Sequence, residues 1–261
     1  MELIIETYSI LGLIILAYMS FWFGAAIFFK RNDVADVAWG LGFLVCALYA
    51  YLFLGDTFGQ SLLVLFLIAM WAFRLSLHIF IRNKGKKEDS RYQKWREDWG
   101  KYFLIRTYFQ VFILQGVLML VVVMPAVVSI IFGGKITAID LIGLVVWIIG
   151  FFFETVGDYQ LSQFVKNPEN KGKILRSGLW KYTRHPNYFG EVAMWWGIWI
   201  IAISAPLPYL TIIGPLAITF LIIFVSGIPL LENKKKGNPD FEDYKKRTSI
   251  FFPLPQKKTS K

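Results

Sequence analysis

Seven long apolar stretches limit what this chain can fold into more than any other feature. Each is close to the roughly 20 residues that a helix needs to cross the hydrocarbon core of a membrane. A bilayer offers no water to backbone groups, so a helix is the form in which such stretches cross it. The expected spans are residues 4–29, 34–54, 62–81, 108–132, 139–159, 188–204 and 209–231. The sequence therefore predicts an all-α, polytopic membrane helix bundle of about seven transmembrane helices, built as a single membrane domain over 1–261.

Positive charge is distributed unevenly among the segments that join these stretches. Segments 30–33, 82–107, 160–187 and 232–261 hold 2, 9, 6 and 9 of the 28 Lys and Arg residues. Arg74 falls inside a span, and Lys135 alone falls in a loop of the opposite side. Loops rich in Lys and Arg stay in the cytoplasm. We therefore expect the amino terminus outside and the carboxyl terminus in the cytoplasm.

The composition excludes several classes of function. A net charge of +10 could indicate nucleic-acid binding, but the basic residues flank the spans, where anionic lipid head groups explain them. One cysteine and two histidines provide no set of metal ligands. The composition predicts a protein whose partner is the lipid bilayer, with no nucleic acid and no metal; it gives no information on protein partners.

The densest group of polar residues precedes the sixth stretch, where residues 178–191 read GLWKYTRHPNYFGE. Pro186 suits the first turn of a helix, so a helix is expected to begin there, with free backbone N–H groups and its positive dipole end near Arg184. That arrangement suits an anionic group such as a pyrophosphate. Trp180 and Tyr182 flank the cations and could stack on an adenine or nicotinamide ring.

Other polar residues lie within the spans or at their ends, and ionisable groups at such depth usually mark functional sites. Arg74 and His78 share one face of the third stretch, and Asp36 is the expected partner of Arg74. The Arg74–Asp36 pair is compatible with a structural or a functional role. His78 is either a core histidine or a proton donor.

Acidic residues mark the later spans in the same way. Glu154 and Asp158 share a face of the fifth stretch, so they must meet cations or donors, or one must be protonated. Tyr188 and Glu191 share a face of the sixth stretch. Glu232 ends the seventh, where it is either a solvated helix end or part of a site.

Six further motifs accompany the 178–191 segment in a fixed order: Asp33–Gly42, Trp71–Ile79, Glu88–Tyr92, Asp158–Gln160, Asn170–Lys173 and Tyr244–Ser249. Together they resemble the steroid 5-alpha-reductase-like family of integral membrane reductases, and most closely its bacterial DUF1295 branch. Sterol reductases and isoprenylcysteine carboxyl methyltransferases share the superfamily and carry similar carboxyl-terminal blocks. Over nearly the whole chain, the resemblance implies a membrane enzyme.

The resemblance implies NADPH as the cofactor, bound by the carboxyl-terminal helices and their cytoplasmic loops, over about residues 154–253. Carried over by motif, the binding residues are Asp158, Lys173, Tyr182, Arg184, His185, Asn187, Glu191 and Tyr244. The polar pattern adds Glu154, Asn170, Trp180, Tyr188, Glu232 and Arg247 to this expected cofactor set. A bacterial inner membrane is the expected location, with the polar cluster on its cytoplasmic side.

The expected reaction is reduction of a carbon–carbon double bond conjugated to a carbonyl group in a lipid or steroid-like substrate. Asp36, if protonated, or His78 would donate to the carbonyl oxygen, with Arg74 and Tyr92 assisting. The chain departs from the eukaryotic steroid reductases, since it has no early Gln-Glu pair and no clear equivalent of the tyrosine that acts with that pair. The alternative is an S-adenosylmethionine-dependent methyltransferase of lipids or prenylcysteine, which Glu232 ahead of Tyr244 and Arg247 also fits.

Overall fold

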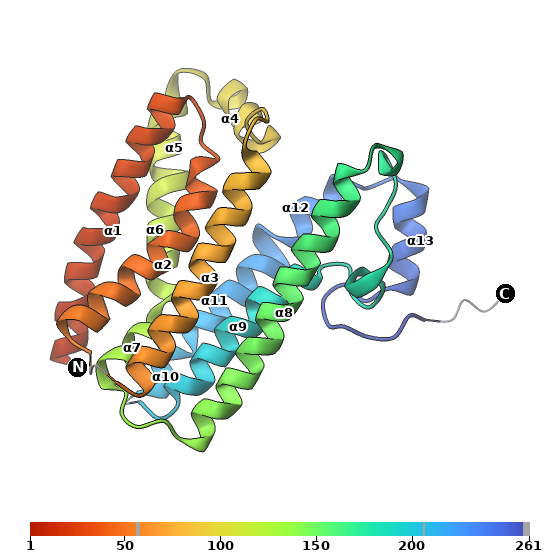
Figure 1. Ribbon diagram of the computed structural model, residues 1–261. Coiled ribbons are helices and arrows are strands. Elements are labelled where there is room, and N and C mark those ends of the chain that lie inside the picture. Colours follow the sequence, from red (N-terminus) through yellow and green to blue (C-terminus); the bar gives the residue numbers. More distant parts are fainter. Residues whose placement is uncertain (56–57, 206, 258–261) are drawn as a thin grey trace. The chain divides into compact units, whose positions relative to one another are not determined.

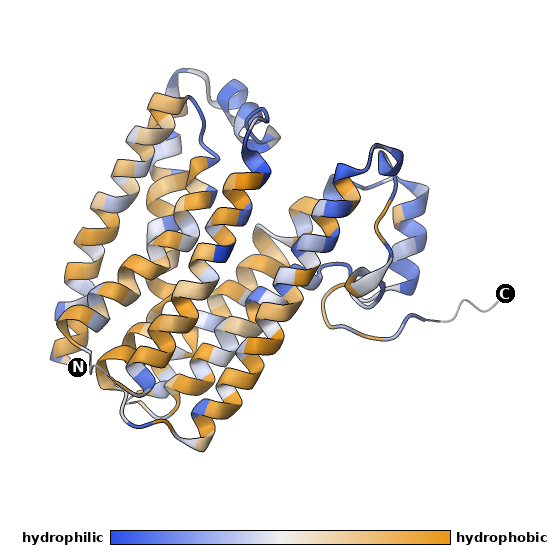
Figure 2. Cartoon of the chain, in the orientation of Figure 1, coloured by the Kyte–Doolittle hydropathy of each residue, from blue (hydrophilic) through white to orange (hydrophobic). Residues whose placement is uncertain are grey.

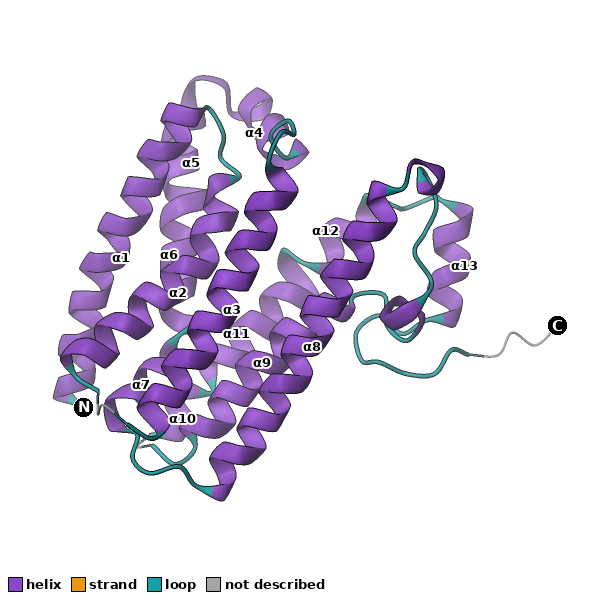
Figure 3. Cartoon of the chain, in the orientation of Figure 1, coloured by secondary structure: helices purple, strands orange, loops and turns teal. Residues whose placement is uncertain are grey.

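The computed structural model describes residues 1–55, 58–205 and 207–257, and every regular element in these ranges is a helix (Figure 3). The all-α prediction is confirmed. Within the described ranges, six helical segments are long and apolar enough to cross a membrane: Glu2–Phe29, Val34–Phe53, Gln60–Asn83, Arg91–Val122, Ala138–Lys166 and Pro208–Asn233. This agrees with a polytopic helical bundle.

Packing divides the chain into two compact units. Unit 1 comprises Met1–Thr137 and Ala202–Gly214, and unit 2 comprises Ala138–Ile201 and Pro215–Lys261. The expected catalytic residues all belong to unit 1, and the expected cofactor residues all belong to unit 2. The single-domain arrangement remains a prediction.

In unit 1 the first three helices are α1 (Glu2–Phe29), α2 (Val34–Phe53) and α3 (Gln60–Asn83) (Figure 1). Small residues let α2 and α3 approach closely, since a Cβ on Gly40 would lie 2.6 Å from Ser76 Oγ. The Ser76 hydroxyl donates to the Val37 carbonyl at 2.9 Å, and the Tyr18 hydroxyl donates to Ala38 at 2.9 Å. Polar side chains thus bond backbone carbonyls of a neighbouring helix, as in other membrane bundles.

The rest of unit 1 is a long helical run and its continuation. The elements are α4 (Ser90–Trp99), η1 (Gly100–Tyr102), α5 (Phe103–Thr107), the π-helical η2 (Tyr108–Ile113), α6 (Leu114–Val122), α7 (Met124–Phe132) and α10 (Pro208–Thr211). The expected span at 108–132 is divided at Val123, because Pro125 suits only the first turn of the new helix α7. The hydrophilic residues of α4 gather at one end of unit 1 (Figure 2).

In unit 2, helices α8 (Ala138–Lys166) and α9 (Pro186–Ala202) pack through glycines. A Cβ on Gly150 would lie 2.6 Å from the Gly190 carbonyl oxygen, and a Cβ on Gly143 would lie 2.7 Å from that of Gly197. Glycine is therefore required for this contact. The start of α9 at Pro186 confirms the expected position. With 17 residues, α9 is shorter than the six helical segments above.

The remaining elements of unit 2 are η3 (Pro168–Asn170), η4 (Gly178–Lys181), α11 (Ile213–Phe220), the π-helical η5 (Leu221–Val225), α12 (Ile228–Asn233) and α13 (Pro239–Arg247). The last span is interrupted at Ser226 and Gly227, a break that the apolar pattern does not predict. A Cβ on Gly227 would lie 2.5 Å from the Ile222 carbonyl oxygen, so the backbone folds back on itself there. Asn238 caps α13 by accepting from the Asp240 amide at 2.9 Å.

Candidate active site

The segment before α9 is fixed by hydrogen bonds to the carboxyl-terminal tail. The Arg184 amide donates to the Ser249 carbonyl at 2.9 Å, and the Leu254 amide donates to the Tyr182 carbonyl at 3.0 Å. The Thr183 hydroxyl donates to the Phe251 carbonyl at 2.8 Å. The position of the side chains in residues 182–187 therefore depends on a tail about 65 residues later in the chain.

Arg184 is buried at the centre of this arrangement, with 7% of its surface exposed. Its Nε donates to Glu232 Oε1 at 2.8 Å, and its Nη2 donates to Glu232 Oε2 at 3.3 Å. Its Nη1 donates to the carbonyls of Thr248 at 2.8 Å and Lys245 at 3.3 Å. A planar guanidinium suits such a two-pronged bond to a carboxylate. All three nitrogens of Arg184 thus hold α12 and the end of α13 to the start of α9.

His185 joins the same carboxylate from the other side. Its Nε2 lies 3.1 Å from Glu232 Oε1, so Nε2 carries the hydrogen and donates it. Burial lowers the pKa of His185 below its usual 6.5, although the bond to Glu232 and the charge of Glu232 favour the protonated form. The imidazole is therefore neutral at neutral pH. Its Nδ1 is then an acceptor, which is buried and bonded to no group of the described residues.

Asn187, two residues after His185, adds a second buried acceptor. Its Nδ2 donates to Asp158 Oδ1 at 3.1 Å, while its Oδ1 is buried with no hydrogen-bond partner in the described chain. Asp158 itself is 8% exposed and Glu154, one turn earlier on α8, is 2% exposed. The start of α9 is therefore rich in acceptors, which suits a ligand with several N–H and O–H donors.

The other expected cofactor residues divide by exposure. Tyr182 is 43% exposed and Lys173 is exposed, so both are accessible. Four are half-buried: Asn170, Tyr188, Glu191 and Arg247. Asn170 donates to the Phe164 carbonyl at 3.0 Å, and the Tyr188 ring stacks on His185 with centroids 5.8 Å apart.

Two of the expected cofactor residues are buried and bonded to backbone. Trp180 Nε1 donates to the Gly157 carbonyl at 3.2 Å. The Tyr244 hydroxyl donates to the Trp180 carbonyl, and burial raises the pKa of Tyr244 above its usual value, so the phenol stays a neutral donor. These bonds hold the η4 segment in place. The polar atoms of Trp180 and Tyr244 are occupied within the protein.

A groove of about 640 Å³ lies beside Glu232 in unit 2. It is lined by Ile223, Ile228, Pro229, Glu232, Asn233, Lys236, Gly237, Glu242, Lys245 and Ile250. Lys245 Nζ lies 3.5 Å from Glu242 Oε2, so two of the four charged groups pair with each other. The groove gives the Arg184–Glu232–His185 network a path to its surroundings.

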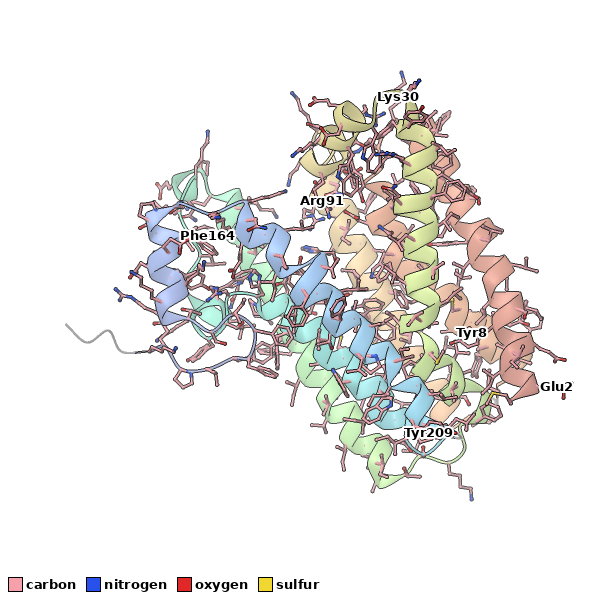
Figure 4. The ribbon with its side chains drawn as sticks, turned by 180° about the vertical axis from the view of Figure 1, so that it is seen from behind. Glu2, Tyr8, Lys30, Arg91, Phe164 and Tyr209 are labelled. Atoms are coloured by element: carbon pink, nitrogen blue, oxygen red, sulfur yellow. The ribbon has the colours of Figure 1, made fainter. Side chains whose placement is uncertain are left out.

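In unit 1 the polar centre is Asp36, near the start of α2. Tyr92 on α4 donates its hydroxyl hydrogen to Asp36 Oδ1 at 3.1 Å, and Arg91 Nη2 donates to Asp36 Oδ2 at 3.2 Å. Both carboxylate oxygens therefore accept. Arg91 is held in turn by Asp89, with Nε 3.0 Å from Oδ1. Figure 4 places Arg91 toward the Lys30 end of unit 1, far from Glu2 and Tyr209.

The structure thus joins Asp36 and Tyr92, two expected catalytic residues whose contact the sequence does not predict. The other two, Arg74 and His78, are half-buried on α3. Asp33 lies at the N-cap position of α2, but its side chain pairs with Arg31 at 2.7 Å and makes no cap hydrogen bond. The guanidinium of Arg31 competes successfully for that carboxylate.

Three contributors escape sequence reasoning. Arg91 completes the Asp36 centre, and its only signal is its place in the Glu88–Tyr92 motif. Thr183 anchors the tail, and its only signal is its place in the 178–191 segment. Arg176 donates to Asp243 at 3.0 Å and links the η4 segment to α13. Within the described residues no group of three or more His, Cys, Asp or Glu side chains could hold a metal ion.

Comparison with known proteins places this arrangement in a family. A family model described as "Protein of unknown function (DUF1295)" matches residues 22–248. The chain belongs to the DUF1295 family. Over 114 residues it is 31% identical to 3-oxo-5-alpha-steroid 4-dehydrogenase 1 of Bos taurus, and 30% identical to that of Homo sapiens.

Each of these matches covers 44% of this chain and 41% of the relative. The chain thus matches about two fifths of the length of these curated relatives. No solved structure matches it. The resemblance expected from the motifs is confirmed at the level of the DUF1295 family and its similarity to steroid 5-alpha-reductases.

Proposed function

We propose that this DUF1295 protein is an integral membrane oxidoreductase that uses NADPH to reduce a carbon–carbon double bond conjugated to a carbonyl group. The substrate in this proposal is a lipid or steroid-like molecule. The observation that carries it is the Asp36–Tyr92 pair, an acid bonded to a phenol at 3.1 Å, in a chain whose relatives are named for 3-oxo steroids.

The proposed topology has seven spans, with α9 added to the six long apolar segments. Its support is the concentration of Lys and Arg in segments 30–33, 82–107, 160–187 and 232–261. That distribution favours an outer amino terminus and a cytoplasmic carboxyl terminus. A bacterial inner membrane with the polar clusters on the cytoplasmic side fits a cofactor drawn from the cytosol.

The chemistry that NADPH supplies when bound is a hydride. Addition of hydride to the β carbon moves the double-bond electrons toward the carbonyl, so negative charge develops on the carbonyl oxygen. A donor fixed in place before the reaction stabilises that charge. The α carbon then takes up a proton that comes from water, so that enone, NADPH and one proton give the saturated ketone and NADP⁺.

In this proposal the single hydroxyl hydrogen of Tyr92, which bonds Asp36 Oδ1 in the free protein, turns to the carbonyl oxygen when the substrate binds, while Arg91 holds Asp36 in place. Both oxygens of Asp36 accept hydrogen bonds, which is the pattern of an ionised carboxylate rather than of a carboxyl donor. The Tyr92 hydroxyl is buried with its residue 2% exposed, so a hydrogen bond from it is not diluted by solvent. Arg74 and His78 stay candidates for assisting the proton transfer.

The residues at the start of α9 fit the cofactor. His185 Nδ1 and Asn187 Oδ1 are buried acceptors without a donor among the residues that the structure describes, and ribose hydroxyls and a carboxamide offer such donors. Tyr182 presents an accessible ring for stacking, and Lys173 an accessible cation for a phosphate. Asp158, Glu191 and Tyr188 surround the same helix start. Arg184, Tyr244 and Trp180 position this segment through the bonds described above.

One observation favours the methyltransferase alternative. Glu232 bonds both Arg184 and His185, so the residue that best fits that class is part of the same network. S-adenosylmethionine carries an ammonium group and a sulfonium charge, which an acceptor-rich site would also attract. A binding experiment separates the two functions because it does not require the natural substrate.

That experiment is a thermal-shift titration of the detergent-purified protein with NADPH, NADH and S-adenosylmethionine. We expect NADPH to raise the unfolding temperature in a saturable way. Lys173→Gln should weaken this effect, and Lys246→Gln, an exposed lysine on α13, serves as the matched control. Stabilisation by S-adenosylmethionine alone would replace the reductase with the methyltransferase, and no stabilisation by either would reject both.

A further inference from the structure

The chain that follows α13 forms a closed loop with fixed ends. At its base the Lys257 amide donates to the Arg247 carbonyl at 3.0 Å, and Gln256 Nε2 donates to Thr248 Oγ1 at 3.3 Å. The hydrogen bonds from Arg184, Thr183 and Leu254 described above fix the middle of the loop. Residues 248–257 are thus a compact loop whose ends meet, not a loose tail.

The side chains of this loop alternate in exposure. Ile250, Phe252 and Leu254 are 43%, 64% and 54% exposed, whereas Phe251 is 5% exposed. In an extended segment, alternate side chains point to opposite sides. One side of the loop is therefore anchored in unit 2, and the other presents three large apolar groups in a row. A loop surrounded only by water would gain nothing from that row.

Packing places the loop at the level of a membrane-spanning helix. The rings of Phe251 and Phe252 contact that of Phe189, with centroids 5.8 Å and 6.1 Å apart. Phe189 in turn contacts Phe153 of α8 at 5.0 Å, and α8 is one of the six helical segments able to cross a membrane. Phe153 directly precedes Glu154 and lies five residues before Asp158, where the apolar part of α8 ends, so the loop lies near the boundary of the bilayer.

Positively charged residues near the loop also fit a position at the bilayer boundary. Lys181 and Lys245 are exposed on the elements that hold it, and Lys257 closes it. A row of apolar groups with flanking lysines is the pattern of segments that lie in the lipid interface, where the apolar groups enter the acyl boundary and the cations meet phosphates.

We propose that the loop 248–257 is a membrane anchor. Its side chains Ile250, Phe252 and Leu254 insert into the bilayer leaflet that lies on the same side of the membrane as α13. The anchor would fix the carbonyls that hold Arg184, and with them the start of α9, against the bilayer. This inference depends on α8 spanning the membrane and not on the proposed reaction. The partner it commits to is bilayer lipid, and no particular head group is required.

The experiment measures the depth of a nitroxide spin label in nanodiscs. Cys46 is the chain's single cysteine and is fully buried, so Cys46→Ser gives a background without reactive thiols. Labels are placed by Phe252→Cys and, separately, by Leu254→Cys. Leu13→Cys on α1, where Leu13 is 68% exposed, is the lipid control, and Lys246→Cys on α13 is the aqueous control.

We expect both loop labels to relax readily with oxygen and poorly with a water-soluble nickel complex, as the Leu13 label does. Accessibility like that of the Lys246 label would overturn the proposal. Strong dipolar coupling between the labels of two copies, if it persists when the protein is diluted in lipid, would also overturn the proposal. A second copy of the chain, and not lipid, would then cover Ile250, Phe252 and Leu254. Two loop positions guard against one substitution that disturbs folding.

Discussion

The main ion pairs of the two units differ in burial and in the hydrogen bonds that surround them. In unit 2 the Arg184 and Glu232 side chains are 8% and 14% exposed, and Arg184 also bonds two carbonyls. In unit 1 the Arg91 and Asp36 side chains are 32% and 19% exposed, and one further acid, Asp89, contacts Arg91. The first pair is the more buried and makes further hydrogen bonds to backbone carbonyls and to His185, whereas the second is the more exposed.

This difference indicates two kinds of polar centre within one polytopic protein. A buried charge is expensive unless every bond it needs is made, so its loss is felt by the fold. A pair that remains partly exposed costs little to break but keeps its groups available for a ligand. We therefore expect substitutions in the Arg184 network to affect stability first, and substitutions at Asp36 and Tyr92 to affect activity first.

The largest expected effect is on stability at Arg184. Arg184→Lys should lower the unfolding free energy by about 3–5 kcal/mol. An ammonium group cannot bond both oxygens of Glu232 and two carbonyls at once, so buried polar and charged groups would lose their partners. Arg91→Lys is the matched control and should cost about 1 kcal/mol or less. Thermal unfolding in detergent measures both, and equal losses would contradict the distinction between the units.

The second effect is on activity at Tyr92. Tyr92→Phe removes the hydroxyl that donates to Asp36, and we expect turnover of an enone to fall about 100-fold or more, as it does when an oxyanion donor is removed. The NADPH-dependent thermal shift should stay unchanged. Asp36→Asn should reduce turnover to a smaller extent. Full turnover of Tyr92→Phe with normal cofactor binding would exclude it as the donor.

The third effect is on the pH dependence of stability. Burial lowers the pKa of His185 in the folded state, so below about pH 6.5 the unfolded chain binds the proton more readily. Stability should therefore fall as the pH decreases from neutral through the folded pKa. His185→Gln should remove part of this slope, and His78→Gln is the control because His78 is the only other histidine. Unfolding temperatures measured from about pH 7.5 to about pH 5 test it, and an unchanged slope in His185→Gln would contradict it.

The smallest effect is expected at Arg247. Its Nε donates to Asp243 at 3.0 Å on the surface of α13, a pair worth at most about 0.5 kcal/mol. Arg247→Ala should leave stability almost unchanged, so its expected cofactor role can be tested without a change in folding. A weaker NADPH shift in this variant would support that role, and an unchanged shift would remove it.

Sequence reasoning predicts the helices well because apolar length is a local property. The stretches expected at 4–29, 34–54, 62–81, 139–159 and 209–231 differ by a few residues from the observed helical segments, apart from the longer carboxyl end of α8. Pro186 marks the start of α9 for an equally local reason. The break at Gly227 is not predicted because it depends on a close approach between the Gly227 backbone and the Ile222 carbonyl. An apolar run gives no signal of such a contact.

The candidate site is predicted as a set of residues but not as a set of contacts. Arg184 and Glu232 are both expected from the sequence, yet their pairing joins positions 48 residues apart. Asp36 and Tyr92 are both expected, yet the bond between them and the contribution of Arg91 depend on how α4 folds against α2. Charge type and position can be read from a single sequence, whereas the partner of each charge is fixed by tertiary packing.

The measurement that tests the central claim most directly is hydride transfer itself. The protein in lipid nanodiscs is incubated with NADPH deuterated at the transferable position and with a 3-oxo-4-ene steroid, and separately with extracted membrane lipids. We predict one deuterium at the β carbon of a saturated product, with one NADP⁺ formed for each, and its loss in Tyr92→Phe. Methyl transfer from S-adenosylmethionine to a lipid, with no deuterium in any product, would contradict the account.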